Sequence, residues 1–171
     1  MSNKLFAQNI DTLQNSDTIN VEIVSSTDNE IGLTLSAKYS KDFVSEIGLT
    51  YGSFQYVGYW PLSTGFTIGS EFIFTQNMTF GPKINGWIQV YPIELNGNLV
   101  YYFDNNGYSS VKFRPEIGYG FHKFSLTYGI NINLWRNSPE ILGLHQISIK
   151  YTLRLKQMKY TEYDRNGNLI K

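Results

Sequence analysis

The chain has 171 residues, no cysteine and no formal net charge at pH 7, and 16% of its residues are aromatic. This length suits one domain. The missing cysteine excludes disulfides, thiol chemistry and cysteine-ligated metals, and the charge balance gives no indication of a nucleic-acid partner. No apolar run reaches about 18 residues, so the sequence predicts no transmembrane helix.

The first residues are expected to lie outside the folded domain. Residues 1–7 end in Leu5-Phe-Ala7 and are interpreted as the remnant of a secretory signal peptide, with a small residue before the cleavage site. A polar N-terminus that was never a signal is the alternative. Residues 8–29 are rich in Asn, Asp, Thr and Ser and are predicted to form a polar arm, in which Val21-Glu-Ile-Val24 is a short strand or a docking segment.

From Ile31 to Leu155, apolar residues alternate with small or polar ones, in segments that each end in a turn. In the clearest copy the apolar positions are Val111, Phe113, Pro115, Ile117, Tyr119 and Phe121, and the positions between them are Lys112, Arg114, Glu116, Gly118 and Gly120. Because alternate residues of a strand face opposite sides, each strand has one apolar face and one polar face. The sequence therefore predicts an all-β fold.

The predicted strands cover residues 31–39, 43–52, 66–75, 79–91, 93–103, 109–121, 124–135 and 145–155. The turns at Pro92 and at His122-Lys123 are short, whereas Asp104-Asn-Asn-Gly107 and residues 136–144 make longer connections. Residues 53–65 either continue the second strand or form a long loop.

Two prolines, Pro82 and Pro115, fall within predicted strands. Proline has no backbone N–H, so each removes one hydrogen-bond donor from the strand pairing. A bulge or an unpaired strand end is therefore expected at each proline.

The polar face of the strands decides between a membrane barrel and a soluble one. A soluble eight-stranded barrel, such as a lipocalin, would carry a hydrated face dense in Lys, Glu and Asp. Here that face is mostly Gly, Ser, Thr and Asn, which suits a narrow, polar interior. Its few charges have both signs, and mutual pairing would offset the cost of burying them. The predicted lumen charge network consists of Lys38, Glu46, Glu71, Lys83, Glu94, Lys112, Arg114, Glu116, Lys150 and Arg154.

The apolar face is almost free of charge within the strands. One Lys or Arg facing lipid at the midplane would cost about 2–4 kcal/mol, so this pattern favours a lipid-facing surface. Aromatic residues near the strand ends suit the headgroup level. The predicted membrane-interface aromatics are Tyr39, Tyr51, Tyr91, Tyr101 and Trp135. We therefore expect an eight-stranded antiparallel up-and-down transmembrane β-barrel over residues 30–156, followed by a polar C-terminal tail over residues 157–171.

The pattern over Glu30–Leu155, with phrases such as Phe113-Arg-Pro-Glu-Ile-Gly-Tyr-Gly120, resembles the small eight-stranded outer-membrane β-barrel domain families of Gram-negative bacteria. The resemblance concerns the fold and carries no functional motif. It implies a bacterial outer-membrane location and contact with outer-membrane lipid. Such barrels include structural anchors, adhesion proteins, lipid-modifying enzymes and accessory subunits of larger membrane assemblies.

No catalytic residue, metal site or cofactor is predicted. An enzyme of this fold would use Ser, His and a carboxylate, and His145 lies near Ser138 and Glu140 in the sequence. Ser148 and His145 have opposite parity in a regular strand and face opposite sides, which argues against that pair. The segment Asp104-Asn-Asn106 is interpreted as a plain turn, with a calcium site as the alternative.

The leading hypothesis is a non-catalytic structural or accessory barrel that docks a protein partner in the outer membrane or periplasm, within a larger membrane assembly. A membrane-embedded lipid-modifying enzyme, of the lipid A deacylase or acyltransferase type, is the second hypothesis. A soluble lipocalin-like ligand carrier is the third. A pore is not expected, because the interior of a barrel of this size is just wide enough for side chains to fill it. An even number of strands places the arm and the tail on one side.

Overall fold

The computed structural model describes residues 25–57, 60–74, 78–107, 109–121, 123–137 and 142–163. Its strands are β1 (Ser25–Tyr39), β2 (Phe43–Val57), β3 (Trp60–Ile73), β4 (Thr79–Val90), β5 (Ile93–Asp104), β6 (Ser109–Phe121), β7 (Phe124–Ile130), β8 (Ile132–Arg136) and β9 (His145–Tyr163). These ranges contain no helical segment that could span a bilayer.

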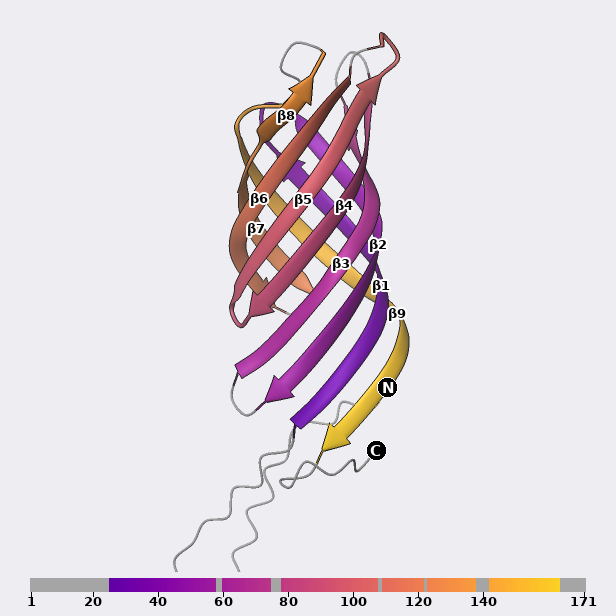
Figure 1. The fold of residues 1–171 in the computed structure, drawn as a ribbon, viewed down its shortest axis with the longest axis vertical. Coiled ribbons are helices and arrows are strands. Elements are labelled where there is room, and N and C mark those ends of the chain that lie inside the picture. Colours follow the sequence, from indigo (N-terminus) through magenta and orange to yellow (C-terminus); the bar gives the residue numbers. More distant parts are fainter. Residues whose placement is uncertain are drawn as a thin grey trace, which may run out of the picture.

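The strands pair antiparallel in the order β5-β4-β3-β2-β1-β9-β7-β6-β8, and β5 also pairs with β6, which closes the sheet (Figure 1). Strands β7 and β8 both pair with β6 and share one position, so the segments form a ring of eight strands. The predicted all-β, antiparallel fold is confirmed. In the orientation of Figure 1, the described chain begins and ends at the lower end of the ring.

Alternation along each strand separates an inner face from an outer face. In β6, burial alternates almost residue by residue: Lys112, Arg114 and Glu116 are buried, whereas Phe113 and Ile117 are exposed. The same alternation runs through β1, β5 and β7. A period of two therefore sets one polar, buried face toward the interior of the ring and one apolar face toward the outside.

Strand pairing is interrupted at both prolines, as expected. Pro82 pairs with Ser70 on β3, but the pairing of β4 with β5 is missing between Phe80 and Lys83. Pro115 pairs with β5, and on its other side the pairing with β7 ends at Glu116. The break between β7 and β8 lies there, so the predicted single strand over residues 124–135 is divided.

The stretch 53–65 is strand on both sides of a short link. β2 continues to Val57 and β3 begins at Trp60, and the two pair along their whole length. The strand alternative for this stretch is therefore correct, and the link at the lower end is as short as the turn at Pro92. Residues 58–59 and His122 lie outside the described residues.

Strands β1, β2, β3 and β9 project beyond the rest of the ring at its lower end (Figure 1). We call this part the strand extension and define it as residues 25–30 of β1, 53–57 of β2, 60–62 of β3 and 156–163 of β9. The expected limits of the barrel, at residues 30 and 156, therefore fall inside β1 and β9. The hydrophobic alternation does not predict these strand ends, because their outward residues are polar as well, as at Thr27, Asn29, Ser53 and Gln55.

Candidate functional site

The predicted lumen charge network lies on the inner face of the ring. Of its members, Lys38, Glu46, Glu71, Lys83, Glu94, Lys112, Arg114 and Glu116 are buried. Lys150 is half-buried, and the Arg154 side chain is 32% exposed near the lower end. Three separate groups contain the ion pairs of Lys38, Glu46, Glu71, Lys83, Glu94, Arg114, Glu116, Lys150 and Arg154.

Glu71 is the centre of the upper group. Its Oε1 lies 2.5 Å from Lys38 Nζ and 3.4 Å from Lys83 Nζ, and it also pairs with Arg114 Nη2. Glu46 lies 2.6 Å from the same Lys38 and 2.7 Å from the same Lys83. These side chains come from β1, β2, β3, β4 and β6, so the group connects strands that are not neighbours in the sheet. Mutual pairing offsets the desolvation of each charge.

Arg114 extends this group toward β7 and β9. Its Nε lies 3.0 Å from Glu116 Oε1, and its Nη1 donates to Gln146 at 2.7 Å and to Asn131 at 3.3 Å. Asn131, at the break between β7 and β8, donates in turn to the carbonyl of Gly143 at 2.8 Å. The interrupted strand thus supplies a side chain to the interior network.

Apolar side chains close the interior above the upper group. The buried members of this apolar plug are Val44, Ile73, Val100, Tyr102 and Leu142. Tyr102 also donates its hydroxyl hydrogen bond to Glu71. Leu142 precedes β9 and is fully buried, so a residue from outside the strands fills the upper end of the ring.

The middle group contains Glu94 and Lys150, whose Oε1 and Nζ lie 2.6 Å apart. The same ammonium lies 6.0 Å from the centre of the Trp87 ring. The indole packs so closely on β3 that a Cβ at Gly65 would lie 2.5 Å from it. Only glycine therefore leaves room for this side chain.

Threonine hydroxyls join four neighbouring strands at the same level. Thr34 Oγ1 lies 2.5 Å from Thr50 Oγ1 and 3.1 Å from Thr152 Oγ1, and Thr50 Oγ1 lies 2.7 Å from Thr67 Oγ1. The cavity that these residues line has a volume of about 20 Å³. That space suits about one water molecule, so side chains fill this level of the interior.

The lower group lies in the strand extension and at its boundary. Arg154 pairs with Glu30 and, at 2.9 Å, with Asp28, and Gln157 donates to the same Asp28 at 2.9 Å. Burial and the nearby Asp28 carboxylate raise the pKa of the Tyr56 phenol. The inner face of the extension therefore continues the polar interior of the ring.

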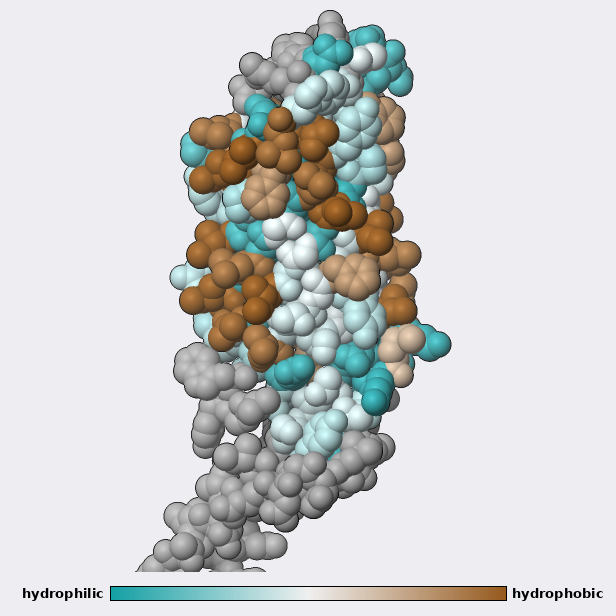
Figure 2. Space-filling model, in the orientation of Figure 1, coloured by the Kyte–Doolittle hydropathy of each residue, from teal (hydrophilic) through white to brown (hydrophobic). Residues whose placement is uncertain are grey.

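Large hydrophobic side chains dominate the outer face of the ring. On the side shown in Figure 2 they gather over the middle of the molecule, with more polar residues toward both ends. Exposed examples from different strands are Leu49, Phe66, Ile84, Ile117, Leu126 and Ile147. The predicted interface aromatics Tyr39, Tyr51, Tyr91, Tyr101 and Trp135 are all exposed on this outer side.

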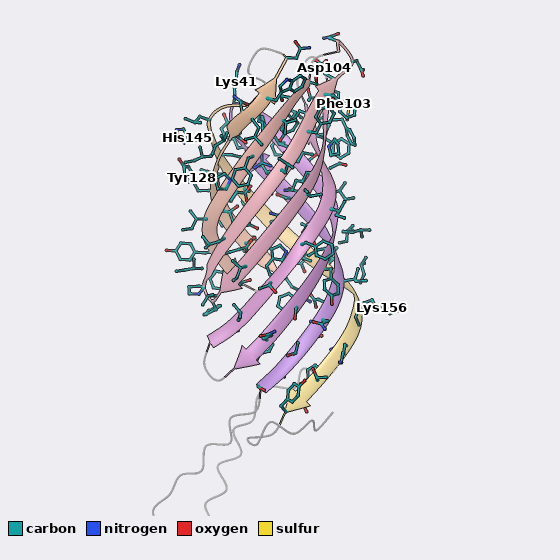
Figure 3. The ribbon with its side chains drawn as sticks, in the orientation of Figure 1. Lys41, Phe103, Asp104, Tyr128, His145 and Lys156 are labelled. Carbon is teal, nitrogen blue, oxygen red and sulfur yellow. The ribbon has the colours of Figure 1, made fainter. Side chains whose placement is uncertain are left out.

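The outer face changes character at the strand extension. Along β1 the outward residues change from Leu33 and Ile31 to Asn29 and Thr27, and Gln55 occupies an outward position on β2. On β9 the residues paired with outward positions of β1 are Lys156 and Lys159, and Figure 3 labels Lys156 where β9 passes below the ring. The outer face of the extension is thus more polar than that of the ring, with Met158 and Tyr160 as its exposed hydrophobic residues on β9.

His145 lies on the outside of the ring, beside Tyr128 (Figure 3). Their rings stack with centroids 5.9 Å apart, and Tyr128 Oη lies 2.6 Å from His145 Nδ1. Ser148 is buried on the inner face, so the opposite orientation expected for His145 and Ser148 is confirmed. Ser138 and Glu140 lie outside the described residues.

The segment after β5 forms a turn. Asp104 Oδ1 accepts a hydrogen bond from the backbone N–H of Asn106 at 2.8 Å, and Gly107 has a positive φ of 80°. Among the residues that the structure describes, no group of three or more His, Cys, Asp or Glu side chains is placed to hold a metal ion.

Sequence reasoning missed several residues of the interior. Asp28 and Glu30 have the same parity as the inward residues of β1, so a longer alternation would have placed them there. Tyr102, by contrast, has the parity of the inward residues of β5, so the alternation predicts it in the lumen, where it is buried. Leu142 carries no periodic signal, because it lies outside the strands.

No protein-family model and no curated protein matches this chain. The function is therefore inferred from the geometry of the ring.

Proposed function

We propose that this chain is an outer-membrane β-barrel with a non-catalytic structural or docking role, as a subunit of a larger membrane assembly. The observation that carries the proposal is the inverted distribution of side chains. Charged and polar residues such as Arg114, Glu71 and Asn98 are buried inside the ring, whereas large hydrophobic residues such as Ile117 and Ile68 are exposed outside. Burial of apolar surface contributes about 25 cal/mol per Å², so an outer face of this kind is stabilised by lipid.

The filled interior favours a structural role over transport. The upper group fills one level of the ring, and the threonine hydroxyls together with Trp87 and Lys150 fill the level below it. An interior packed in this way stabilises the closed sheet and leaves little room for a permeating solute. A soluble lipocalin-like carrier would instead need an apolar interior and a hydrated outer face.

The lipid-modifying alternative has weaker support from the described residues. His145 is engaged by Tyr128 on the outer side, and Ser148 lies on the other face of the same strand. A nucleophile and its base must lie within hydrogen-bond reach of each other.

Heat-modifiable migration tests the membrane barrel. The full chain, extracted in mild detergent, should migrate faster on a gel before boiling than after it, because a closed barrel resists the gel detergent until it is boiled. A chain that stays monomeric and folded in buffer without detergent would contradict the proposal. For the docking role, native purification in gentle detergent should retain a stoichiometric membrane partner. Recovery of a homogeneous monomer at every detergent concentration would argue against it.

A further inference from the structure

Strand β9 has one edge that no described residue covers. β7 pairs with β9 only from His145 to Tyr151, and the backbone N–H of Thr152 then donates to the carbonyl of Lys123. From Leu153 to Tyr163, β9 pairs with β1 on one side only. Every residue from 153 to 160 is exposed. We call Leu153–Tyr163 the β9 edge.

The opposite side of the strand extension offers no comparable edge. β3 is paired with β4 from Leu62 onward, and the carbonyl of Pro61 accepts a hydrogen bond from the backbone N–H of Tyr91. Pro61 itself has no N–H to donate. Of the two sides of the extension, only the β9 edge presents a long row of backbone groups.

The β9 edge is net basic, with Arg154, Lys156 and Lys159 against one carboxylate, Glu162, which accepts a hydrogen bond from Tyr160. Lys156 and Lys159 are exposed and form no ion pair with any described residue. Arg154 pairs with Asp28 and Glu30 on the inner side. A second copy of the chain would bring lysines against lysines, and lysines on a strand edge are a known protection against self-pairing. An acidic strand would meet opposite charge at the same positions.

We infer that the β9 edge is the docking site for an extended acidic segment of a protein partner, which adds a strand to the sheet below the membrane-facing ring. Backbone hydrogen bonds to β9 supply affinity and the two lysines supply the preference for acidic residues, as in other cases of strand addition. The inference deepens the proposed docking function and rests on it. A docking role accounts for the length of the strand extension, which exceeds what closure of the ring requires.

Two irregularities interrupt the pairing of β9 with β1. The register with β1 shifts between Ile31 and Gly32 and again between Asn29 and Glu30, and neither Leu155 nor Met158 has a partner in β1. Bulges of this kind bend and twist a strand. Because Met158 is not paired with any residue of β1, it can be substituted without removing a residue pair between β1 and β9.

Binding of a defined peptide tests the inference. The probe is a fluorescent peptide of the length of Leu153–Tyr163 that alternates Glu with Thr and Val, and its control carries Lys in place of Glu. The full chain in mild detergent should bind the acidic peptide about tenfold more tightly than the basic one. Amide hydrogen exchange across the β9 edge should slow on binding, while exchange in β5 should not change. Equal binding of both peptides would overturn the proposal.

Matched variants locate the binding site. The double variant Lys156→Glu with Lys159→Glu should lose about tenfold in affinity for the acidic peptide and prefer the basic one. The control variant, Lys41→Glu with Asn105→Glu and Asn106→Glu, makes the same change in net charge on exposed turns at the opposite end of the ring and should bind as the parent chain does. Equal losses in the two variants would show a general charge effect and contradict the assignment to β9.

Met158→Pro separates strand addition from simple charge attraction. It removes one backbone donor but no charge, and it should weaken acidic-peptide binding while heat-modifiable migration is retained. Unchanged binding by Met158→Pro would contradict strand addition. If the parent chain shows no heat-modifiable migration, the membrane barrel itself is wrong. If migration is normal and the peptide preference is absent, only the edge proposal fails.

Other occupants of the β9 edge give different results. If phosphatidylglycerol vesicles slow amide hydrogen exchange across the β9 edge and compete with the peptide, the edge is a membrane contact. If exchange across the edge slows as the protein concentration rises, before peptide is added, the edge is a contact with a second copy of the chain. Slow exchange at every protein concentration would mean that the chain itself covers the edge. Each of these results overturns the proposal.

Discussion

The strand extension continues β1, β2, β3 and β9 of the ring, but its outer face differs from that of the ring. Along β1, the outward residues of the ring are apolar, such as Leu33 and Leu35, and those of the extension are polar, such as Thr27 and Asn29. Both parts keep a polar inner face, with ion pairs around Glu71 in the ring and around Arg154 in the extension. The period of two therefore sets the direction of each side chain, whereas the type of outward residue indicates the medium around it.

The largest difference between the two parts is expected in their buried ion pairs. Glu71→Ala leaves Lys38, Lys83 and Arg114 without their shared carboxylate inside the ring, and it should lower the free energy of unfolding by about 3–5 kcal/mol. Glu30→Ala in the extension leaves Arg154 one-third exposed and still paired with Asp28, so it should cost about 1 kcal/mol or less.

Urea unfolding in detergent micelles, followed by tryptophan fluorescence, measures both changes. The two variants remove the same kind of side chain from β3 and β1, which makes them a matched pair. Equal losses would show that the ring interior is no more dependent on its charges than the extension is.

The next difference concerns the outer faces. Ile117 is 55% exposed on the outer face of the ring. If that face were in water, Ile117→Lys would leave the free energy of unfolding nearly unchanged. In lipid, the substitution should lower it by about 2–4 kcal/mol. Gln55→Lys on the extension should change stability by no more than about 0.5 kcal/mol. Reversible unfolding of the chain in lipid vesicles gives both values. Two neutral substitutions would argue that the outer face of the ring is in water.

The smallest of these effects is expected at the apolar plug. Leu142 is fully buried, so Leu142→Ala should lower the free energy of unfolding by about 2 kcal/mol. Leu155 is exposed on the outer side of β9, and Leu155→Ala should cost less than about 1 kcal/mol. Urea titration of the two variants checks this. A larger loss at Leu155 than at Leu142 would contradict the assignment of Leu142 to the closed upper end.

The ring was predictable from the sequence because its two faces differ in hydrophobicity. Ser109–Phe121 alternates so regularly that its limits are those of β6. The extension was not predictable in this way, because Thr27, Asn29 and Ser53 make both faces polar and give those segments the composition of a loop. A hydrophobic pattern detects a strand only where the two faces of the sheet differ in hydrophobicity.

The interior was predictable in its residue types but not in its partners. Parity alone places Lys38, Glu71 and Arg114 on the inner face, but the pairing of residues from non-adjacent strands depends on the tilt and closure of the ring. The division of β7 from β8 follows from Pro115 on the neighbouring strand, which the sequence of β7 does not show. Leu142 reaches the interior from outside the strands, where no periodic pattern applies.

The most direct test of the account is the environment of single labelled positions on the two outer faces. The chain has no cysteine, so Ile117→Cys and Gln55→Cys each provide one site for a nitroxide spin label in reconstituted vesicles. We predict that the label at 117 collides with oxygen and is shielded from a water-soluble nickel complex, and that the label at 55 shows the reverse. Equal access of the nickel complex to both labels would contradict a membrane-embedded ring.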